Sequence, residues 1–265
     1  TQAFQKRVTR SLRLLTNTEL ISAYLPSEDS FFDQLLAPDI STAIEFKPEI
    51  YDVPINGKWF VSDLERFNRL YEQLYSFFYS SQPQFITDLG KKVSNYLHAP
   101  WQGGFSRVHL FEALKRAIPS VHDLEIKQMR YASPGEIKIE AMQSVGASIS
   151  ECILNYIQNE NDISRVIKEV QTLLSSTNLN TSNLSSISDD RLTLTADQKV
   201  FLLERNTQIS NLLRIHEEIG ELTSNSPNMV VTSKVIIAVV SRIEKLAEFE
   251  SSGLLDLQRP AVTAS

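Results

Sequence analysis

The amino-acid sequence predicts a helix-rich α+β fold with one or two β-hairpins and a C-terminal α-helical hairpin. Apolar side chains recur at helical spacing along most of the chain, whereas two short regions alternate apolar and polar residues as β-strands do. A polar stretch then separates the last two long helical patterns from the rest. We therefore expect a helix-rich α+β domain over residues 1–174, a linker or loop over 175–190, and a helical hairpin over 191–260.

Composition narrows the class of protein. The chain has 265 residues, which is enough to bury a sizeable core. Its net charge of −6 argues against nucleic-acid binding over the whole surface. The single cysteine, Cys152, rules out a disulfide within the chain and fits a reducing compartment. No apolar run reaches the roughly 18 residues that span a bilayer, and the first residues lack the apolar core of a signal peptide. We therefore expect a cytoplasmic protein with no membrane partner.

The first predicted helix, over residues 4–25, carries a basic face. Lys6, Arg7, Arg10 and Arg13 supply four positive charges within sixteen residues that contain no acid. Such a face is suited to a phosphate backbone or to the acidic face of another protein. The alternative, which the charge pattern favours, is a solvated helix surface.

A hairpin is expected next. AIEFK (43–47) and EIYDV (49–53) have strand-like composition, and Asn56-Gly57 before KWFV (58–61) is a strong signal for a two-residue hairpin turn.

The pair Ser62 and Glu65 then forms the pattern of a capping box, which predicts the start of a helix over residues 63–80. We expect its apolar and aromatic stripe to lie in the core: Phe67, Leu70, Tyr71, Leu74, Phe77 and Phe78.

Gly103 and Gly104 predict a tight turn into a helix over residues 107–118, with Ser106 at its N-cap. The exposed N–H groups of that helix start, together with Arg107, are suited to a phosphate or another anion. The alternative is a plain capped helix, because the glycine fingerprints of known nucleotide sites are missing.

A second hairpin is predicted from LEIKQMRYA (124–132) and EIKIEAM (136–142), joined by a Ser-Pro-Gly turn within a helix–strand–strand–helix unit. The apolar phase of the first strand changes along its length, which predicts a bulge near Gln128. The bulge re-aims Arg130 and Tyr131, so we add these two residues to the ligand-binding candidates.

This hairpin also carries an acidic residue followed by an E-x-K triplet: Asp123, Glu136 and Lys138. The arrangement resembles that of the PD-(D/E)xK nucleases. The resemblance implies that the two carboxylates bind Mg²⁺ while the lysine helps to activate water for attack on a phosphodiester. A second E-x-K triplet over residues 125–127 and the charge alternation of a half-solvated strand favour a purely structural interpretation. Without this Mg²⁺ we expect no cofactor.

Nearly half of the chain, from residue 141 on, shows helical patterns apart from one polar stretch. Patterns over residues 141–157 and 163–174 come first, with Cys152 on an apolar face, and the polar stretch follows. Thr195 and Gln198 then form a second capping box, before helices that run to about 222 and from about 230 to 249. We expect these last two helices to pack onto the first domain or against a second subunit.

The segments GGFSRVHLF (103–111) and MRYASPGEI (129–137) together resemble a motif pair of uncharacterised bacterial proteins of similar size. This resemblance implies a bacterial origin and transfers no catalytic role. The missing catalytic constellations, the amphipathic terminal helices and the long polar linker lead us to expect a non-catalytic interaction or regulatory protein, a homodimer or a subunit of a bacterial cytoplasmic complex. The alternatives are the Mg²⁺-dependent nuclease and a nucleotide or phosphate sensor built on the Gly103–Arg107 segment.

Overall fold

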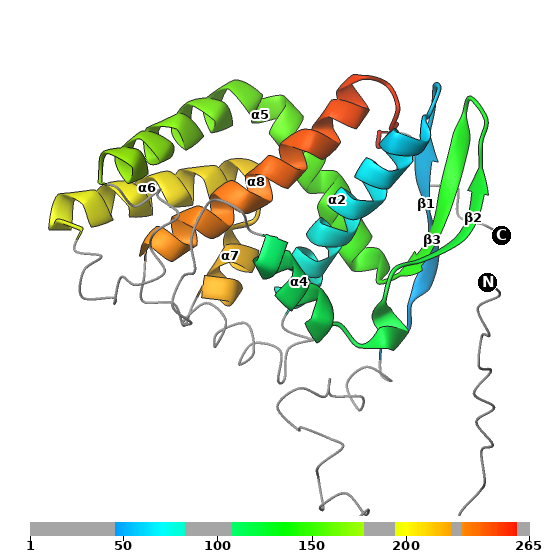
Figure 1. Ribbon diagram of the computed structural model, residues 1–265, viewed down its shortest axis with the longest axis horizontal. Coiled ribbons are helices and arrows are strands. Elements are labelled where there is room, and N and C mark those ends of the chain that lie inside the picture. The colour runs from blue at the N-terminus through cyan, green and yellow to red at the C-terminus, as the bar shows by residue number, and fades with distance from the viewer. Residues whose placement is uncertain (1–45, 83–107, 178–193, 224–228, 259–265) are drawn as a thin grey trace, which may run out of the picture. The chain divides into compact units, whose positions relative to one another are not determined.

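The computed structural model describes residues 46–82, 108–177, 194–223 and 229–258. They form six α-helices, a short 3-10 helix and a three-stranded antiparallel sheet, which confirms the predicted helix-rich α+β class (Figure 1). The elements are β1 (Glu49–Ile55), α2 (Val61–Ser80), α4 (Val108–Ala117), η3 (Ser120–His122), β2 (Glu125–Arg130), β3 (Gly135–Ala141), α5 (Gln143–Ser176), α6 (Ala196–Leu213), α7 (His216–Thr223) and α8 (Met229–Ser251). The predicted helix over residues 4–25 and most of the predicted linker lie outside the described residues.

The sheet has the strand order β1-β3-β2, and both outer strands pair antiparallel with β3. On β3 the side chains alternate strictly, with Ile137 and Ile139 buried on the inner face and Glu136, Lys138 and Glu140 on the outer face. The predicted hairpin of β2 and β3 is confirmed, and so is its bulge. Ile126 lies opposite Ile139 and Gln128 opposite Lys138, so Lys127 is the extra residue.

The predicted hairpin turn at Asn56-Gly57 is wrong, because β1 pairs with β3 and the chain continues directly into α2. Gly57 does adopt a left-handed backbone with φ of +67°. The next residues do not return along β1, because Trp59 packs on the helices instead. Its indole N–H donates to the carbonyl oxygen of Asn56 at 3.0 Å, and its ring stacks on Phe249 of α8 at 5.4 Å.

Helix α2 begins earlier than predicted. Its N-cap is Phe60, whose backbone N–H donates to the Asp63 carboxylate at 2.9 Å. Ser62 therefore lies inside the first turn, and the predicted Ser62–Glu65 box is wrong because Asp63 is the acceptor that the helix start uses. The predicted aromatic stripe is confirmed as core.

Helix α5 consists of two helical segments joined at a kink, in agreement with the two helices predicted over residues 141–157 and 163–174. It bends at Asn159, where φ is −119°, and the side-chain amide of Asn159 donates to the carbonyl oxygen of Asn155 at 2.9 Å. The first part of α5 lies against the sheet, where a Cβ on Gly146 would come within 2.7 Å of the Tyr51 ring. Glycine at this position lets the helix approach β1 closely.

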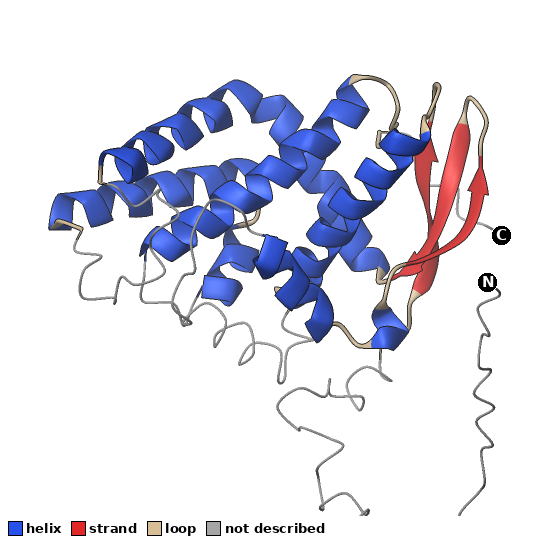
Figure 2. Cartoon of the chain, in the orientation of Figure 1, coloured by secondary structure: helices blue, strands red, loops and turns tan. Residues whose placement is uncertain are grey.

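The remaining helices extend the layer of helices beside the sheet. Helices α6 and α8 contact α5 and each other, α8 also contacts α2, and α7 contacts α6 and α8. The predicted capping box of α6 is confirmed, with Thr195 and Gln198 each accepting from the backbone N–H of the other. The helices gather on one side of the sheet (Figure 2). None of the described helices is long and apolar enough to cross a membrane.

Candidate functional site

The strand β2 is exposed along its whole length, although its inner-face side chains are apolar. Ile126 and Met129 lie opposite Ile139 and Ile137 of β3, so they continue the face of the sheet that the helices cover. Their side chains nevertheless remain 48% and 37% exposed. Among the described residues the sheet is therefore wider than the helix layer, and no described helix covers its apolar face at β2. We call the six residues of β2 together with Tyr131 the β2 edge.

Charged groups accompany these apolar side chains. The Lys127 ammonium pairs with the carboxylate of Glu125 at 2.8 Å and also with that of Glu140, which places Lys127 on the outer face. Arg130 lies opposite Glu136 at the other end of β2 and forms no ion pair with any described residue. Strand β2 thus has an acidic first residue and a basic last residue.

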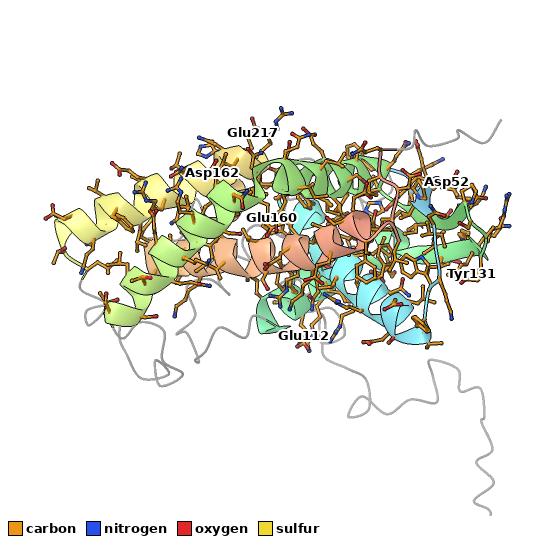
Figure 3. The ribbon with its side chains drawn as sticks, turned by 90° about the horizontal axis from the view of Figure 1, so that it is seen from above. Asp52, Glu112, Tyr131, Glu160, Asp162 and Glu217 are labelled. Carbon is orange, nitrogen blue, oxygen red and sulfur yellow. The ribbon has the colours of Figure 1, made fainter. Side chains whose placement is uncertain are left out.

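The turn after β2 is fixed to the segment that follows β1. The backbone N–H of Trp59 donates to the Tyr131 hydroxyl at 3.3 Å, and the Ser133 hydroxyl donates to the Asn56 side-chain oxygen. A Cβ on Gly135 would lie 2.5 Å from the carbonyl oxygen of Arg130, so only glycine fits the return into β3. Tyr131 itself is 58% exposed, and Figure 3 shows it at the sheet, away from Glu160 and Asp162 of α5.

The three predicted nuclease residues are not brought together. Asp123 precedes β2, and the next paired residue, Glu125, lies opposite Glu140. Glu136 precedes Glu140 by four residues in β3, so the pairing separates Glu136 from the Glu125 end of β2 by roughly 13 Å at 3.3 Å per residue. Burial raises the pKa of the Asp123 carboxyl, and nearby Lys115 opposes that shift.

In place of Asp123, the pairing of β1 with β3 brings Asp52 to the E-x-K triplet. Asp52 lies directly opposite Lys138, whose ammonium is 3.9 Å from the Asp52 carboxylate and 4.0 Å from that of Glu136. The three side chains are only 11%, 25% and 24% exposed, in the order Asp52, Lys138, Glu136. We call them the outer-face cluster (Figure 3 labels Asp52). No local pattern in the sequence indicates Asp52, because Lys138, its neighbour in the sheet, is distant along the chain.

Two other chemically versatile side chains, those of His122 and Cys152, are buried in the core. His122 is fully buried, with Nδ1 2.6 Å from the Tyr79 hydroxyl and Nε2 donating to the carbonyl oxygen of Phe46 at 2.8 Å. Cys152 is buried on α5 as predicted, and burial raises the pKa of its thiol. Within the described residues no group of three or more His, Cys, Asp or Glu side chains is arranged to hold a metal ion.

A groove of about 900 Å³ runs between the second half of α5 and the start of α6. Leu173 and Phe201 form its apolar lining, and the Glu169 carboxylate in its wall pairs with Arg165 at 3.0 Å and with Arg205 at 2.7 Å. The Arg205–Glu169 ion pair therefore links the two helices beside the groove, whereas the Arg165–Glu169 pair lies within α5.

The other predicted site residues lie outside the described residues. They are the basic set Lys6, Arg7, Arg10 and Arg13 and the anion-site set Gly103, Gly104, Ser106 and Arg107. Comparisons of the chain with protein-family models, curated proteins and solved structures give no match.

Proposed function

We propose that this chain is a non-catalytic interaction or regulatory protein, a subunit of a bacterial cytoplasmic complex, and that it binds its partner through the β2 edge. The observation that carries the proposal is the exposure of Ile126, Met129 and Tyr131 on an outer strand. Proteins commonly shorten, charge or cover such edges, because a row of backbone N–H and C=O groups beside apolar side chains can receive another strand. An apolar edge left uncovered marks a surface for a partner.

The contrast with the buried polar groups supports this proposal. His122 and Cys152 are enclosed by the core, where hydrogen bonds or apolar contacts occupy them. The side chains offered to solvent at the β2 edge are instead the kinds that contribute to protein interfaces, namely methionine, tyrosine and arginine.

Site-specific photocrosslinking tests the proposal. A photoreactive phenylalanine analogue at Met129 of the full chain should give a crosslinked adduct of defined mass in bacterial cells. The same analogue at exposed Arg116 on α4 is the matched control and should give none. Absence of any adduct from Met129, or equal adducts from both positions, would contradict binding through the β2 edge.

The outer-face cluster favours a second candidate function, a Mg²⁺-dependent nuclease in which Asp52 takes the place of Asp123. Its support is the juxtaposition of two carboxylates with Lys138 at 3.9 and 4.0 Å, a donor set suited to Mg²⁺ and to assisting attack on a phosphodiester. The test is incubation of the full chain with DNA or RNA and Mg²⁺ or Mn²⁺. Cleavage should depend on the metal and be lost in Asp52→Asn, whereas Asp123→Asn should retain it. Lack of cleavage, or cleavage that survives Asp52→Asn, removes this candidate.

A further inference from the structure

We propose that the occupant of the β2 edge is a second copy of this chain, whose β2 adds antiparallel to the first about a two-fold axis between Lys127 and Gln128. The inference rests on the proposed function and names its partner and register. Within the described residues β2 pairs with β3 alone, and no other described strand bonds to its outer side.

The bulge makes the face pattern of β2 symmetric. Glu125 lies on the outer face, Ile126 on the inner face and Lys127 on the outer face; Gln128 lies opposite outer-face Lys138, and Met129 opposite inner-face Ile137. With Arg130 opposite Glu136, the order is outer, inner, outer, outer, inner, outer, and it reads the same in both directions. A regular six-residue strand alternates and lacks this symmetry. The extra residue therefore lets two antiparallel copies of β2 match face with face.

The side chains that this register places opposite each other are complementary. Glu125 faces Arg130 of the partner subunit, and the symmetry repeats this ion pair at the other end of the strand. Ile126 faces Met129 of the partner subunit on the inner face, which covers the two exposed apolar side chains with each other. Lys127, already paired with Glu125 and Glu140, faces the uncharged Gln128 of the partner subunit. Arg130, which has no ion pair with a described residue, gains one.

Neighbouring registers fail on the same pattern. A shift by one residue sets Ile126 against Gln128 of the partner subunit, which lies on the opposite face. A shift by two sets Ile126 against Lys127 of the partner subunit, again on the opposite face. Among registers shifted by up to two residues, only the unshifted one therefore satisfies both the faces and the charges.

The other edge of the sheet favours a closed pair over an open array. The outer side of β1 is bonded at its end by the segment after α8, since Asn56 N–H donates to the Leu254 carbonyl at 2.9 Å and Asp256 N–H to the Pro54 carbonyl at 3.2 Å. A two-fold contact through β2 uses the same patch on both copies and so ends at two subunits. The product is a dimer with one six-stranded sheet.

Charge reversal in the full-length protein tests this register. The wild type should self-associate reversibly to a dimer in sedimentation velocity between about 1 and about 500 μM. Arg130→Glu and Glu125→Arg should each weaken association by roughly tenfold or more, because each sets like charges opposite each other at both ends of the interface. The double variant Glu125→Arg/Arg130→Glu restores opposite charges and should return the dissociation constant to within about threefold of the wild type.

Arg116→Glu on α4 and Glu160→Arg on α5 are the matched controls and should leave association unchanged (Figure 3 labels Glu160). Circular dichroism and thermal unfolding confirm that every variant is folded. If neither single reversal changes the dissociation constant of the dimer, or if the double variant does not restore it, this inference is overturned while the proposed function stands. A monomer at all concentrations overturns it too. A Met129 adduct with a different protein then still supports the proposed function, whereas no adduct removes both.

Discussion

Strands β1 and β2 flank the same central strand and pair with it in the same antiparallel sense, but the helices cover only one of them. On β1 the inner-face residues Val53 and Ile55 are 4% and 0% exposed, whereas on β2 Ile126 and Met129 are 48% and 37% exposed. The end of β1 is additionally bonded to the segment after α8. The difference lies in the layer above the sheet and not in the strands themselves. The proposed interaction surface thus lies where the sheet extends beyond the described helices.

Truncation of one inner-face isoleucine on each strand should reveal this contrast most strongly. Ile55→Ala removes a side chain with no exposed surface and should lower the free energy of unfolding by about 2–5 kcal/mol. Ile126→Ala is the matched variant on β2 and should cost about 0.5 kcal/mol or less, because much of that side chain is in water. Chemical denaturation at low protein concentration, where self-association does not contribute, measures both. Equal costs would mean that β2 is covered as β1 is.

The turn between β2 and β3 offers a way to loosen β2 alone. Gly135→Ala should cost roughly 1–3 kcal/mol, because the new Cβ would lie 2.5 Å from the carbonyl oxygen of Arg130 and force the turn to open. Hydrogen exchange should then accelerate in β2 more than in β1. Gly220→Ala, on α7, is the control: its Cβ meets nothing within 4 Å, so stability should stay equal or rise. Uniform acceleration across all three strands would contradict a local effect.

The same comparison explains what the sequence could predict. The β2–β3 hairpin and its bulge follow from neighbouring residues, so local alternation and a Ser-Pro-Gly turn were enough to predict them. The partner of β1 lies far along the chain, and a local turn signal at Asn56-Gly57 outweighed it. For this reason Asp52 was not predicted to face Lys138. Alternation also predicts the face of Ile126 and Met129 but not whether a helix covers that face, and coverage is what makes the β2 edge a candidate site.

The smallest expected effect concerns the segment that covers β1. The Glu250 carboxylate of α8 accepts the backbone N–H of Leu257 at 2.9 Å and so holds that segment in place. Burial raises the pKa of Glu250 above its ordinary value of 4.5, while the Leu257 hydrogen bond opposes the shift. The folded chain therefore binds this proton more tightly than the unfolded chain, and the free energy of unfolding falls as the pH rises through the interval above 4.5.

The variant Glu250→Gln keeps an acceptor for Leu257 and does not titrate. Its melting temperature should therefore rise relative to that of the wild type as the pH increases from about 4 to about 7. Thermal unfolding across that range, with Glu244→Gln on the exposed side of α8 as the control for removing one charge, measures the gain. The opposite result is a wild-type melting temperature that rises relative to that of the variant as the pH increases. It would show that the hydrogen bond from Leu257 stabilises the ionised Glu250 carboxylate by more than burial destabilises it.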